Sequence, residues 1–358
     1  MSRPIRFLLA ILPLSLPVAS PGALASEPPG APVAATIATT LSTAGEQIRQ
    51  LAFDGDAGTG FVSAEDAGRD DHFTLEFATP VTVTSLSVST GRPDGGDRLD
   101  AGTLQVSADG VTFEDRAPFA AGAARAEPLG RRVRSIRIRP AADRGHPLAI
   151  REIAIVSDPP VATFAYPVEF VVDTADAPEL NEWAERVARE CERAYPMINE
   201  ELQSDGFTPP RLVSLTLRRR YRGVAMTSGS RITGSVAYFQ RHPEDVGAMI
   251  HETAHVVQRY RARSNPSWLV EGVADYVRFF KHEPGKLGPI NPNSARYDRS
   301  YRVTAAFLAY LVDTYDKEIV RTLNRAMRAG RYRESIFEER TGKALPELDA
   351  EWRATLRR

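Results

Sequence analysis

The spacing of hydrophobic residues divides the chain into two parts near residue 160. From about residue 51 to residue 157, apolar and polar residues alternate in short runs such as Phe73–Phe77 and Val133–Ile138. Alternation of this kind is typical of strands that bury one face. Asp-Gly pairs, which favour turns, stand between the runs at 54–55, 94–95 and 109–110. The first part therefore predicts an all-β antiparallel sandwich, with separate strands at 73–77 and 81–88.

The second part has a different pattern, with strands first and helices afterwards. Residues 168–172 and 212–217 are predicted strands, and residues 224–232 have the pattern of an irregular edge strand that contains Ser228-Gly229. Apolar residues at helical spacing predict a helix over about 177–202. Further helices are predicted at about 244–260, 267–280, 301–315, 317–329 and 345–357. A small sheet followed by a series of helices indicates an α+β fold.

The first 25 residues have the pattern of a secretory signal peptide. Arg3 and Arg6 precede an apolar run that ends near Val18, and Ala23-Leu24-Ala25 offers a cleavage site. The apolar run is too short to span a bilayer, so cleavage after Ala25 should leave a mature chain without a transmembrane segment. We therefore expect a secreted or periplasmic protein.

Composition and periodicity together divide the chain into five segments. A stretch rich in Ala, Pro and Thr after the signal peptide predicts a flexible lead-in, and Pro159-Pro160 predicts a stiff, extended linker. The expected segments are a signal peptide (1–25), a lead-in (26–40), a β-sandwich (41–158), a proline linker (159–162) and an α+β domain (163–358).

Charge and cysteine content narrow the class of protein. Lys and Arg together number 45, and Asp and Glu 46, which gives a formal net charge of −1. This balance argues against nucleic acid as a partner, because nucleic acid favours a basic surface. Cys191 is the sole cysteine, so an exported fold without a disulfide must be held by its core or by a metal. The small apolar neighbours of Cys191 predict that it is buried.

A metal-binding motif lies within the helix predicted at 244–260, where residues 251–255 read His-Glu-Thr-Ala-His. Residues four apart lie on the same face of a helix, so His251 and His255 can present two imidazole nitrogens to one ion. Zinc favours such ligands, and Zn²⁺ is the predicted cofactor. Glu252 is adjacent to the first histidine, where its carboxylate can reach a water molecule on the metal and act as a general base.

A third metal ligand is expected on the next predicted helix. Glu271 follows His255 by 16 positions, which leaves room for a turn at Asn265-Pro266 and for the start of a returning helix. Asp275 lies four residues further on the same helical face, where it can accept a hydrogen bond from a ligand histidine and fix its tautomer. Glu271 is therefore the predicted third metal ligand, and an exchange of roles, with Asp275 on zinc, stays open.

The order of the β runs resembles a known type of domain. The segments FDGDAGTGF (53–61), LQVSADGVTFE (104–114) and LAIREIAI (148–155) follow one another as in discoidin or coagulation-factor type C domains. The resemblance covers roughly residues 40–158 and implies a galactose-binding-like jelly roll. Because many such domains bind sugars, the resemblance also implies a carbohydrate ligand for this part of the chain.

The second part resembles the basic secretory protein family, whose members are assigned as zinc peptidases. HETAHVVQ (251–258) and WLVEGVADYVRF (268–279) carry the likeness, which extends over about residues 163–345. The zinc motif of the family falls on His251, Glu252 and His255, and its glutamate falls on Glu271. The resemblance implies a gluzincin-like metallopeptidase with a zincin-like fold. This chain departs from the family in being slightly acidic and in carrying a sandwich domain in front.

A peptidase needs groups beyond its metal ligands. Glu252 would take a proton from water and pass it to the leaving amine. Tyr301 is the first candidate for a hydrogen-bond donor to the oxyanion, with Tyr276 and His242 as alternatives. The backbone of an extended substrate would pair with the edge strand formed by Gly223, Val224, Ala225 and Met226.

Three functions would use these residues. The first is an exported zinc metallopeptidase that acts on protein or glycoprotein substrates while its sandwich binds a carbohydrate. The second is a non-catalytic glycan-binding protein on a peptidase-like scaffold, which the intact Glu252 disfavours. The third is a zinc amidase that acts on cell-wall peptide and needs the same residues.

Overall fold

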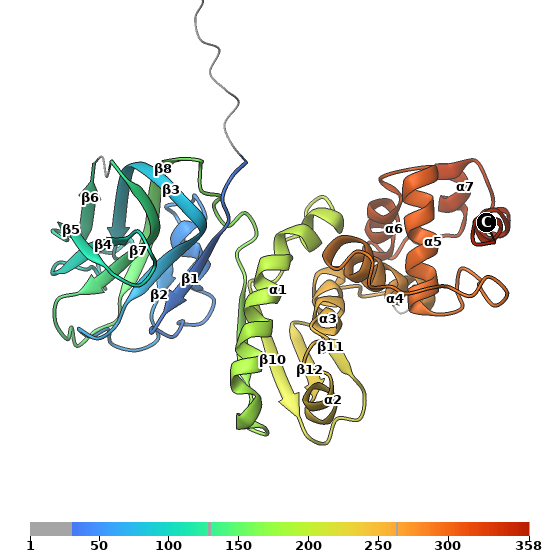
Figure 1. Ribbon diagram of the computed structural model, residues 1–358, viewed down its shortest axis with the longest axis horizontal. Helices are drawn as coiled ribbons and strands as arrows, with labels where there is room; N and C mark the ends of the chain where they lie inside the picture. Colours follow the sequence, from blue (N-terminus) through green and yellow to red (C-terminus); the bar gives the residue numbers. More distant parts are fainter. Residues whose placement is uncertain (1–30, 128–129, 263, 358) are drawn as a thin grey trace, which may run out of the picture.

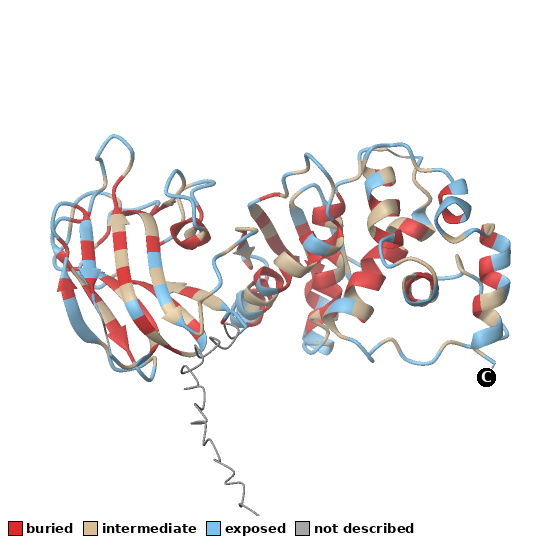
Figure 2. Ribbon diagram, turned by 90° about the horizontal axis from the view of Figure 1, so that it is seen from above, coloured by how far each residue is buried: buried red, intermediate tan, exposed pale blue. Residues whose placement is uncertain are grey.

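The computed structural model describes residues 31–127, 130–262 and 264–357, and the predicted signal peptide lies outside these residues. The chain forms an all-β sandwich and a second body with a small sheet and mostly helices, side by side along the long axis (Figure 1). Buried residues form two cores, one in each body (Figure 2). Among the described helices, none is long and apolar enough to cross a membrane.

The sandwich is built from antiparallel strands. They are β1 (Ala35–Thr39), β2 (Phe61–Val62), β3 (Phe73–Thr90), β4 (Gly102–Ser107), β5 (Glu114–Pro118), β6 (Ala123–Ala126), β7 (Arg132–Pro140) and β8 (Ala149–Asp158). The hydrogen-bonding order is β2-β8-β3-β7-β4-β5, and β1 and β6 also pair with β3. A short 3-10 helix, η1 (Arg49–Phe53), follows β1. The all-β fold predicted for the first part is confirmed.

The long strand β3 joins the two parts of the sandwich sheet. Its first half pairs with β1 and β7, and its second half pairs with β6 and β8. The register with β7 shifts between Glu76 and Val81, and Pro80 lies in this shift, where a missing N–H is tolerated. The two strands predicted at 73–77 and 81–88 are therefore one strand, because the proline is accommodated at an irregularity.

The sandwich also begins earlier than predicted. β1 lies in the segment that was expected to be a flexible lead-in, and it pairs with β3 along its whole length. Ile37 in the middle of β1 is buried in the core of the sandwich. The prediction was wrong because the Ala-rich composition of 34–40 gives a weak strand signal, whereas pairing with β3 makes the segment a strand.

The second body contains a four-stranded mixed sheet. Its strands are β9 (Glu169–Asp173), β10 (Leu212–Arg218), β11 (Ala225–Ser228) and β12 (Arg231–Ser235), in the order β11-β12-β10-β9. β10 is parallel to β9 and β12, whereas β11 is antiparallel to β12. The single irregular strand predicted at 224–232 is thus a hairpin, with Gly229 in its turn at a φ of +64°. β11 is an edge strand of this sheet.

Helices make up most of the rest of the second body. They are η2 (Pro178–Leu180), α1 (Asn181–Glu201), α2 (Val236–Arg241), α3 (Gly247–Gln258), α4 (Ser267–Tyr276), α5 (Tyr301–Thr314), α6 (Ile319–Arg328), α7 (Ser335–Thr341) and α8 (Leu345–Thr355). A π-helical segment, η3 (Val277–His282), continues α4. The six predicted helices are present with shifted ends, and α2 and α7 are too short for periodicity to indicate. Cys191 of α1 is buried, as predicted.

A glycine determines how closely α4 approaches α5. A Cβ atom on Gly272 of α4 would lie 2.1 Å from Cγ2 of Thr304 of α5, so a larger residue could not make the observed contact. Thr304 is buried, and its hydroxyl donates a hydrogen bond to the backbone oxygen of Tyr297. On its other side α4 contacts α3, which in turn contacts β11 and β12. Helices α3 and α4 are therefore held between the sheet and α5.

A largely buried cluster of charges joins the two bodies. Arg49 of η1 donates a hydrogen bond to Glu192 of α1 at 2.6 Å and lies 3.7 Å from Glu169 of β9. Thr43 donates to the same Glu169 at 2.6 Å. The side chains of Arg49 and Glu192 are only 14% and 6% exposed. Separation of the bodies would leave these charges without their partners, so the cluster fixes the sandwich against the α+β body.

Replacing Arg49 with methionine should lower the free energy of unfolding of the whole chain by about 3 kcal/mol, because removal of one partner leaves buried carboxylates uncompensated. Urea denaturation measures this difference. Arg125→Met is the matched control, since Arg125 is 72% exposed and its replacement should change the free energy by less than about 0.5 kcal/mol. Equal stability of the Arg49 and Arg125 variants would contradict a structural role for the cluster.

Candidate metal centre

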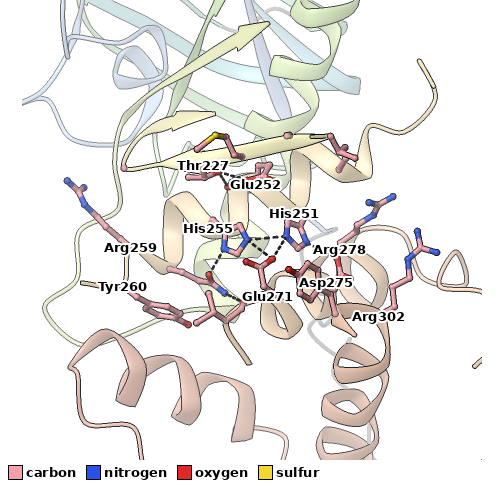
Figure 3. A pocket seen from close by; sticks show the side chains of 18 of the residues that line it. Thr227, His251, Glu252, His255, Arg259, Tyr260, Glu271, Asp275, Arg278 and Arg302 are labelled. Carbon is pink, nitrogen blue, oxygen red and sulfur yellow. Dashed lines mark hydrogen bonds and ion pairs between the residues drawn. The ribbon is translucent and has the colours of Figure 1, made fainter. Parts of the chain in front are cut away.

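Three side chains from two neighbouring helices converge on one point. His251 and His255 lie one turn apart on α3, and Glu271 lies on α4. Nε2 of His251 is 3.1 Å from Nε2 of His255 and 3.2 Å from Oε2 of Glu271. Nε2 of His255 is 3.4 Å from the same oxygen of Glu271. The three side chains point toward one another in a cleft of about 810 Å³ (Figure 3). They form a cluster that can hold a metal ion.

The outer nitrogen of each histidine makes a hydrogen bond that fixes the tautomer. Nδ1 of His251 lies 2.7 Å from Oδ1 of Asp275, a carboxylate that only accepts, so Nδ1 donates. Nδ1 of His255 lies 2.7 Å from Oε1 of Gln258. The amide of Gln258 is oriented by its donation to the backbone oxygen of Val270, so Nδ1 of His255 also donates. In the neutral histidines both Nε2 lone pairs are therefore directed into the cluster.

Three acceptors at these distances repel one another unless a positive charge lies among them. Burial disfavours a charge on His251, but its hydrogen bonds to Asp275 and Glu271 outweigh burial and raise the pKa of His251 to about 9. Burial also raises the pKa of Glu271, but the two histidines outweigh this effect and lower it to about 2. The cluster is thus arranged around a cation, which can be a proton or a metal ion.

Glu252 lies beside the cluster and lines the same cleft. Its Oε2 accepts a hydrogen bond from the hydroxyl of Thr227 on β11 at 2.7 Å, and the same hydroxyl lies 2.9 Å from the backbone oxygen of Glu252. Glu252 is only 8% exposed. A carboxylate anchored in this way through one oxygen can use the other to accept a proton.

Tyr301 lies at the cleft, as its predicted role requires. It is the first residue of α5, it is 49% exposed, and its ring stacks on that of His251 with 6.4 Å between the ring centroids. The negative charge of Glu271, followed by burial, raises the pKa of the Tyr301 hydroxyl. The hydroxyl therefore stays protonated at neutral pH and can donate a hydrogen bond.

The two alternatives to Tyr301 lie away from the cleft. Tyr276, the last residue of α4, is buried and stacks on Phe280. His242 packs on Tyr238, and neither His242 nor Tyr276 lines the cleft. The oxyanion role stays a prediction for all three residues, and Tyr301 is the one among them that lines the cleft.

The edge strand β11 forms one wall of the cleft, but it differs in extent from the predicted substrate strand. The prediction covered Gly223, Val224, Ala225 and Met226, whereas the strand begins at Ala225 and ends at Ser228. Val224, Ala225 and Met226 line the cleft, whereas Gly223 lines only a neighbouring cavity. The difference arises because the turn at Ser228-Gly229 closes a hairpin.

The pairing of β11 with β12 shows which backbone groups are turned to the free edge. The backbone oxygen of Val224 accepts a hydrogen bond from the N–H of Ser235, next to the pair Ala225–Gly234. Since bonding groups alternate in direction along an antiparallel strand, Ala225 and Thr227 direct their N–H and C=O groups away from β12. The carbonyl of Ala225 already accepts the hydroxyl of Tyr221 at 3.0 Å.

Two residues that complete the site were missed from the sequence. Thr227 anchors Glu252, but a threonine in an edge strand carries no signal of this contact. Gln258 fixes the tautomer of His255 from three positions further along α3. Its helical spacing could have identified it, because residues three apart on a helix are neighbours.

Several solved structures are similar to the N-terminal sandwich. One is the module CBM32-1 from a family 31 glycoside hydrolase of Clostridium perfringens, at 21% identity, 34% of this chain, 92% of that chain and a TM-score of 0.30. A second is the family 32 module of C. perfringens NanJ in complex with galactose, and a third is a Streptococcus pneumoniae fucose-binding module. Their sequence identities are 16% and 17%; each match covers 34% of this chain and 92% of the other chain, with a TM-score of 0.29. No curated protein matches the chain.

The second body matches a family of peptidases. The sequence profile of the BSP family, described as "Peptidase of plants and bacteria", matches residues 171–352. The matched region begins in β9 and ends in α8, so it includes the sheet, both helices of the metal cluster and Tyr301. It covers about half of the chain and agrees with the resemblance noted in the sequence. The chain belongs to this family of plant and bacterial peptidases.

Proposed function

We propose that this protein is an exported zinc metallopeptidase whose site is held by His251, His255 and Glu271. The observation that carries the proposal is the convergence of three acceptor atoms, each directed inward by helix position or by an outer hydrogen bond. Membership in a peptidase family supports hydrolysis of peptide bonds as the reaction.

The spacing of the three atoms supports zinc in particular. Zinc binds nitrogen and carboxylate oxygen at about 2.0–2.1 Å in a tetrahedral arrangement, which puts neighbouring ligand atoms about 3.3 Å apart. The separations here are 3.1, 3.2 and 3.4 Å. Two histidines and one glutamate are also the ligand set of catalytic zinc sites that leave a fourth position to water. In this proposal Asp275 remains the hydrogen-bond partner of His251.

The residues around the metal site can perform the remaining parts of peptide hydrolysis. Zinc, when bound, would supply a Lewis acid and lower the pKa of a water molecule. Glu252, held by Thr227, would take the proton of the attacking water and transfer it to the leaving amine. The hydroxyl of Tyr301 would donate a hydrogen bond to the developing oxyanion. The free edge of β11, at Ala225 and Thr227, would bind the substrate backbone in extended form.

The other functions considered from the sequence are less well supported. A non-catalytic scaffold would have no need for the buried hydrogen bond that holds Glu252 beside the metal cluster. An amidase acting on cell-wall peptide would use the same groups, and it differs from a peptidase only in the substrate. Export rests on the pattern of residues 1–25, and the carbohydrate ligand of the sandwich stays a prediction.

Purified full-length protein should bind one zinc ion per chain and cleave unfolded casein in a reaction that chelators stop. Glu252→Gln should keep the zinc and lower the rate at least 100-fold, because proton transfer by a positioned base contributes about 10²–10⁴-fold. Glu338→Gln, which changes an exposed glutamate of α7, is the matched control and should keep full activity. Zinc content by elemental analysis and casein cleavage are measured on the same samples.

Two results would contradict the proposal. If the wild-type protein takes up no zinc after reconstitution, the metal site is wrong. If Glu252→Gln and wild type cleave casein at the same rate, Glu252 is not the base. One zinc ion in both proteins with no cleavage by either would shift support to a cell-wall amidase.

Zinc binding should release protons, and the number should depend on pH. In the metal-free protein His251 has a pKa of about 9, above its ordinary value of 6.5, so it carries a proton at pH 7 that a ligand must lose. We expect at least about one proton released per zinc near pH 6, where His251 is protonated and a zinc-bound water with a pKa of about 7 still keeps its own proton. Calorimetric titration in buffers of different ionisation enthalpy measures this number.

The same pKa makes the stability of the metal-free protein depend on pH. A raised pKa in the folded state stabilises the fold fully below pH 6.5, and this contribution is lost as the pH rises through 9. The zinc-loaded protein should lack this loss. Zinc binding near pH 6 without proton release would contradict the assignment of His251.

A further inference from the structure

The carboxylates that line the metal cleft already have partners. Glu252 accepts from Thr227, and Asp275 and Glu271 are held by the histidines. The remaining acid, Asp245, accepts hydrogen bonds from Arg278 and Tyr238. The cleft therefore presents little negative charge to a ligand once its metal is bound.

Three arginines of the cleft, in contrast, have no acidic partner. Arg259, Arg261 and Arg302 line the cleft and are exposed. Within the described ranges, no carboxylate lies within ion-pair distance of any of them. The guanidinium of Arg302 lies 5.1 Å from the ring centroid of Phe279, a contact that leaves its N–H groups free to point outward. Figure 3 shows Arg259 on one side of the histidine pair and Arg302 on the opposite side.

The backbone at Arg259 gives an independent reason to look for a role. Arg259 follows the last residue of α3 and has φ and ψ of +42° and +42°, the left-handed conformation. Glycine or asparagine is usual at this position, because a Cβ atom makes the conformation unfavourable. Arg259 thus holds an unfavourable backbone conformation while it lines the cleft, and such strain is frequent at functional sites.

The positive charge continues into a neighbouring cavity. This cavity shares Val224 and Tyr238 with the metal cleft. It is lined by Arg219, Arg220, Arg222 and Arg241. Arg219 is paired with Glu179, whereas Arg220 and Arg222 have no ion-pair partner in the part of the chain that the structure describes. The free edge of β11 thus runs between groups of uncompensated guanidinium ions, on a chain whose net charge is only −1.

We propose that the cleft selects peptides that carry acidic side chains on both sides of the scissile bond. This inference rests on the proposed peptidase function and names the substrate class of the same site. A strand bound along β11 would have its scissile bond at the metal, while its flanking residues lie toward Arg259 at one end and Arg302 at the other. Guanidinium groups bind carboxylates through two parallel hydrogen bonds, which gives direction as well as attraction.

Binding can be measured without turnover in zinc-loaded Glu252→Gln protein. The probes are two fluorescent decapeptides of identical length, one with Glu on both sides of a central Ala-Leu bond and one with Gln at the same positions. We expect the Glu peptide to bind about tenfold more tightly at low salt, with the difference shrinking as salt screens the charges. Arg259→Gln and Arg302→Gln should each remove about half of the difference on a logarithmic scale. Arg125→Gln, on the sandwich, should leave it unchanged.

The outcomes separate this inference from the function on which it rests. Equal binding of the two peptides overturns the acidic preference, even if wild type cleaves both. Preferential binding of the Glu peptide that depends on Arg259 and Arg302 supports the preference, even if wild type cleaves neither and the peptidase function fails. If oligogalacturonate binds more tightly than the Glu peptide, and Arg259→Gln and Arg302→Gln weaken its binding, the arginines recognise an anionic polysaccharide. This result would overturn the peptide proposal. Should Glu252→Gln not fold, kcat/KM of wild type for the two peptides gives the same comparison.

Discussion

The metal cluster brings together three acceptor atoms that repel one another in the absence of a cation, and the surrounding fold holds them in place. The Nε2 atoms of His251 and His255 and a carboxylate oxygen of Glu271 lie 3.1–3.4 Å apart in a partly buried cluster. Such an arrangement is unfavourable without a cation. It can persist only because the surrounding fold is rigid: α3 is held between the sheet and α4, and Gly272 lets α4 pack directly on Thr304 of α5. The geometry of the metal cluster therefore depends on the packing of α3, α4 and α5.

The position of the edge strand β11 and the contact between the two bodies depend on the same rigid packing. The edge strand β11 lies against α3, so the hydroxyl of Thr227 reaches Glu252 while the free edge of the strand faces the cleft. On the far side of the sheet, Arg49 ties the sandwich to Glu169 of β9 and Glu192 of α1. A ligand bound by the sandwich would thus be held at a fixed distance from the metal cleft.

Local patterns in the sequence were enough to predict the chemical core of the site. Two histidines four residues apart share a helix face wherever a helix forms, so His251 and His255 could be identified with no knowledge of the fold. The apolar residues around Glu271 and Asp275 indicated a second buried helix nearby. The alternation of residues in the first half predicted the sandwich in the same way.

The features that the sequence did not reveal depend on contacts between distant segments. β1 has a weak pattern of its own and is a strand because β3 provides a partner. Arg49 carries no local signal of its role, because α1 brings its partner Glu192 to it from a distant part of the chain. Thr227 gains its role only when a hairpin turn sets β11 against α3. In each case the missing information is tertiary geometry, which no local pattern contains.

The central claim is that His251, His255 and Glu271 bind one zinc ion. X-ray absorption at the zinc edge of the loaded full-length protein tests it most directly. The account predicts four nitrogen or oxygen ligands at about 2.0–2.1 Å, two of them with the scattering of imidazole rings, and no sulfur. His255→Ala should remove one imidazole contribution. Sulfur ligation, or a spectrum that is unchanged in His255→Ala, would show that zinc binds elsewhere and would contradict the account.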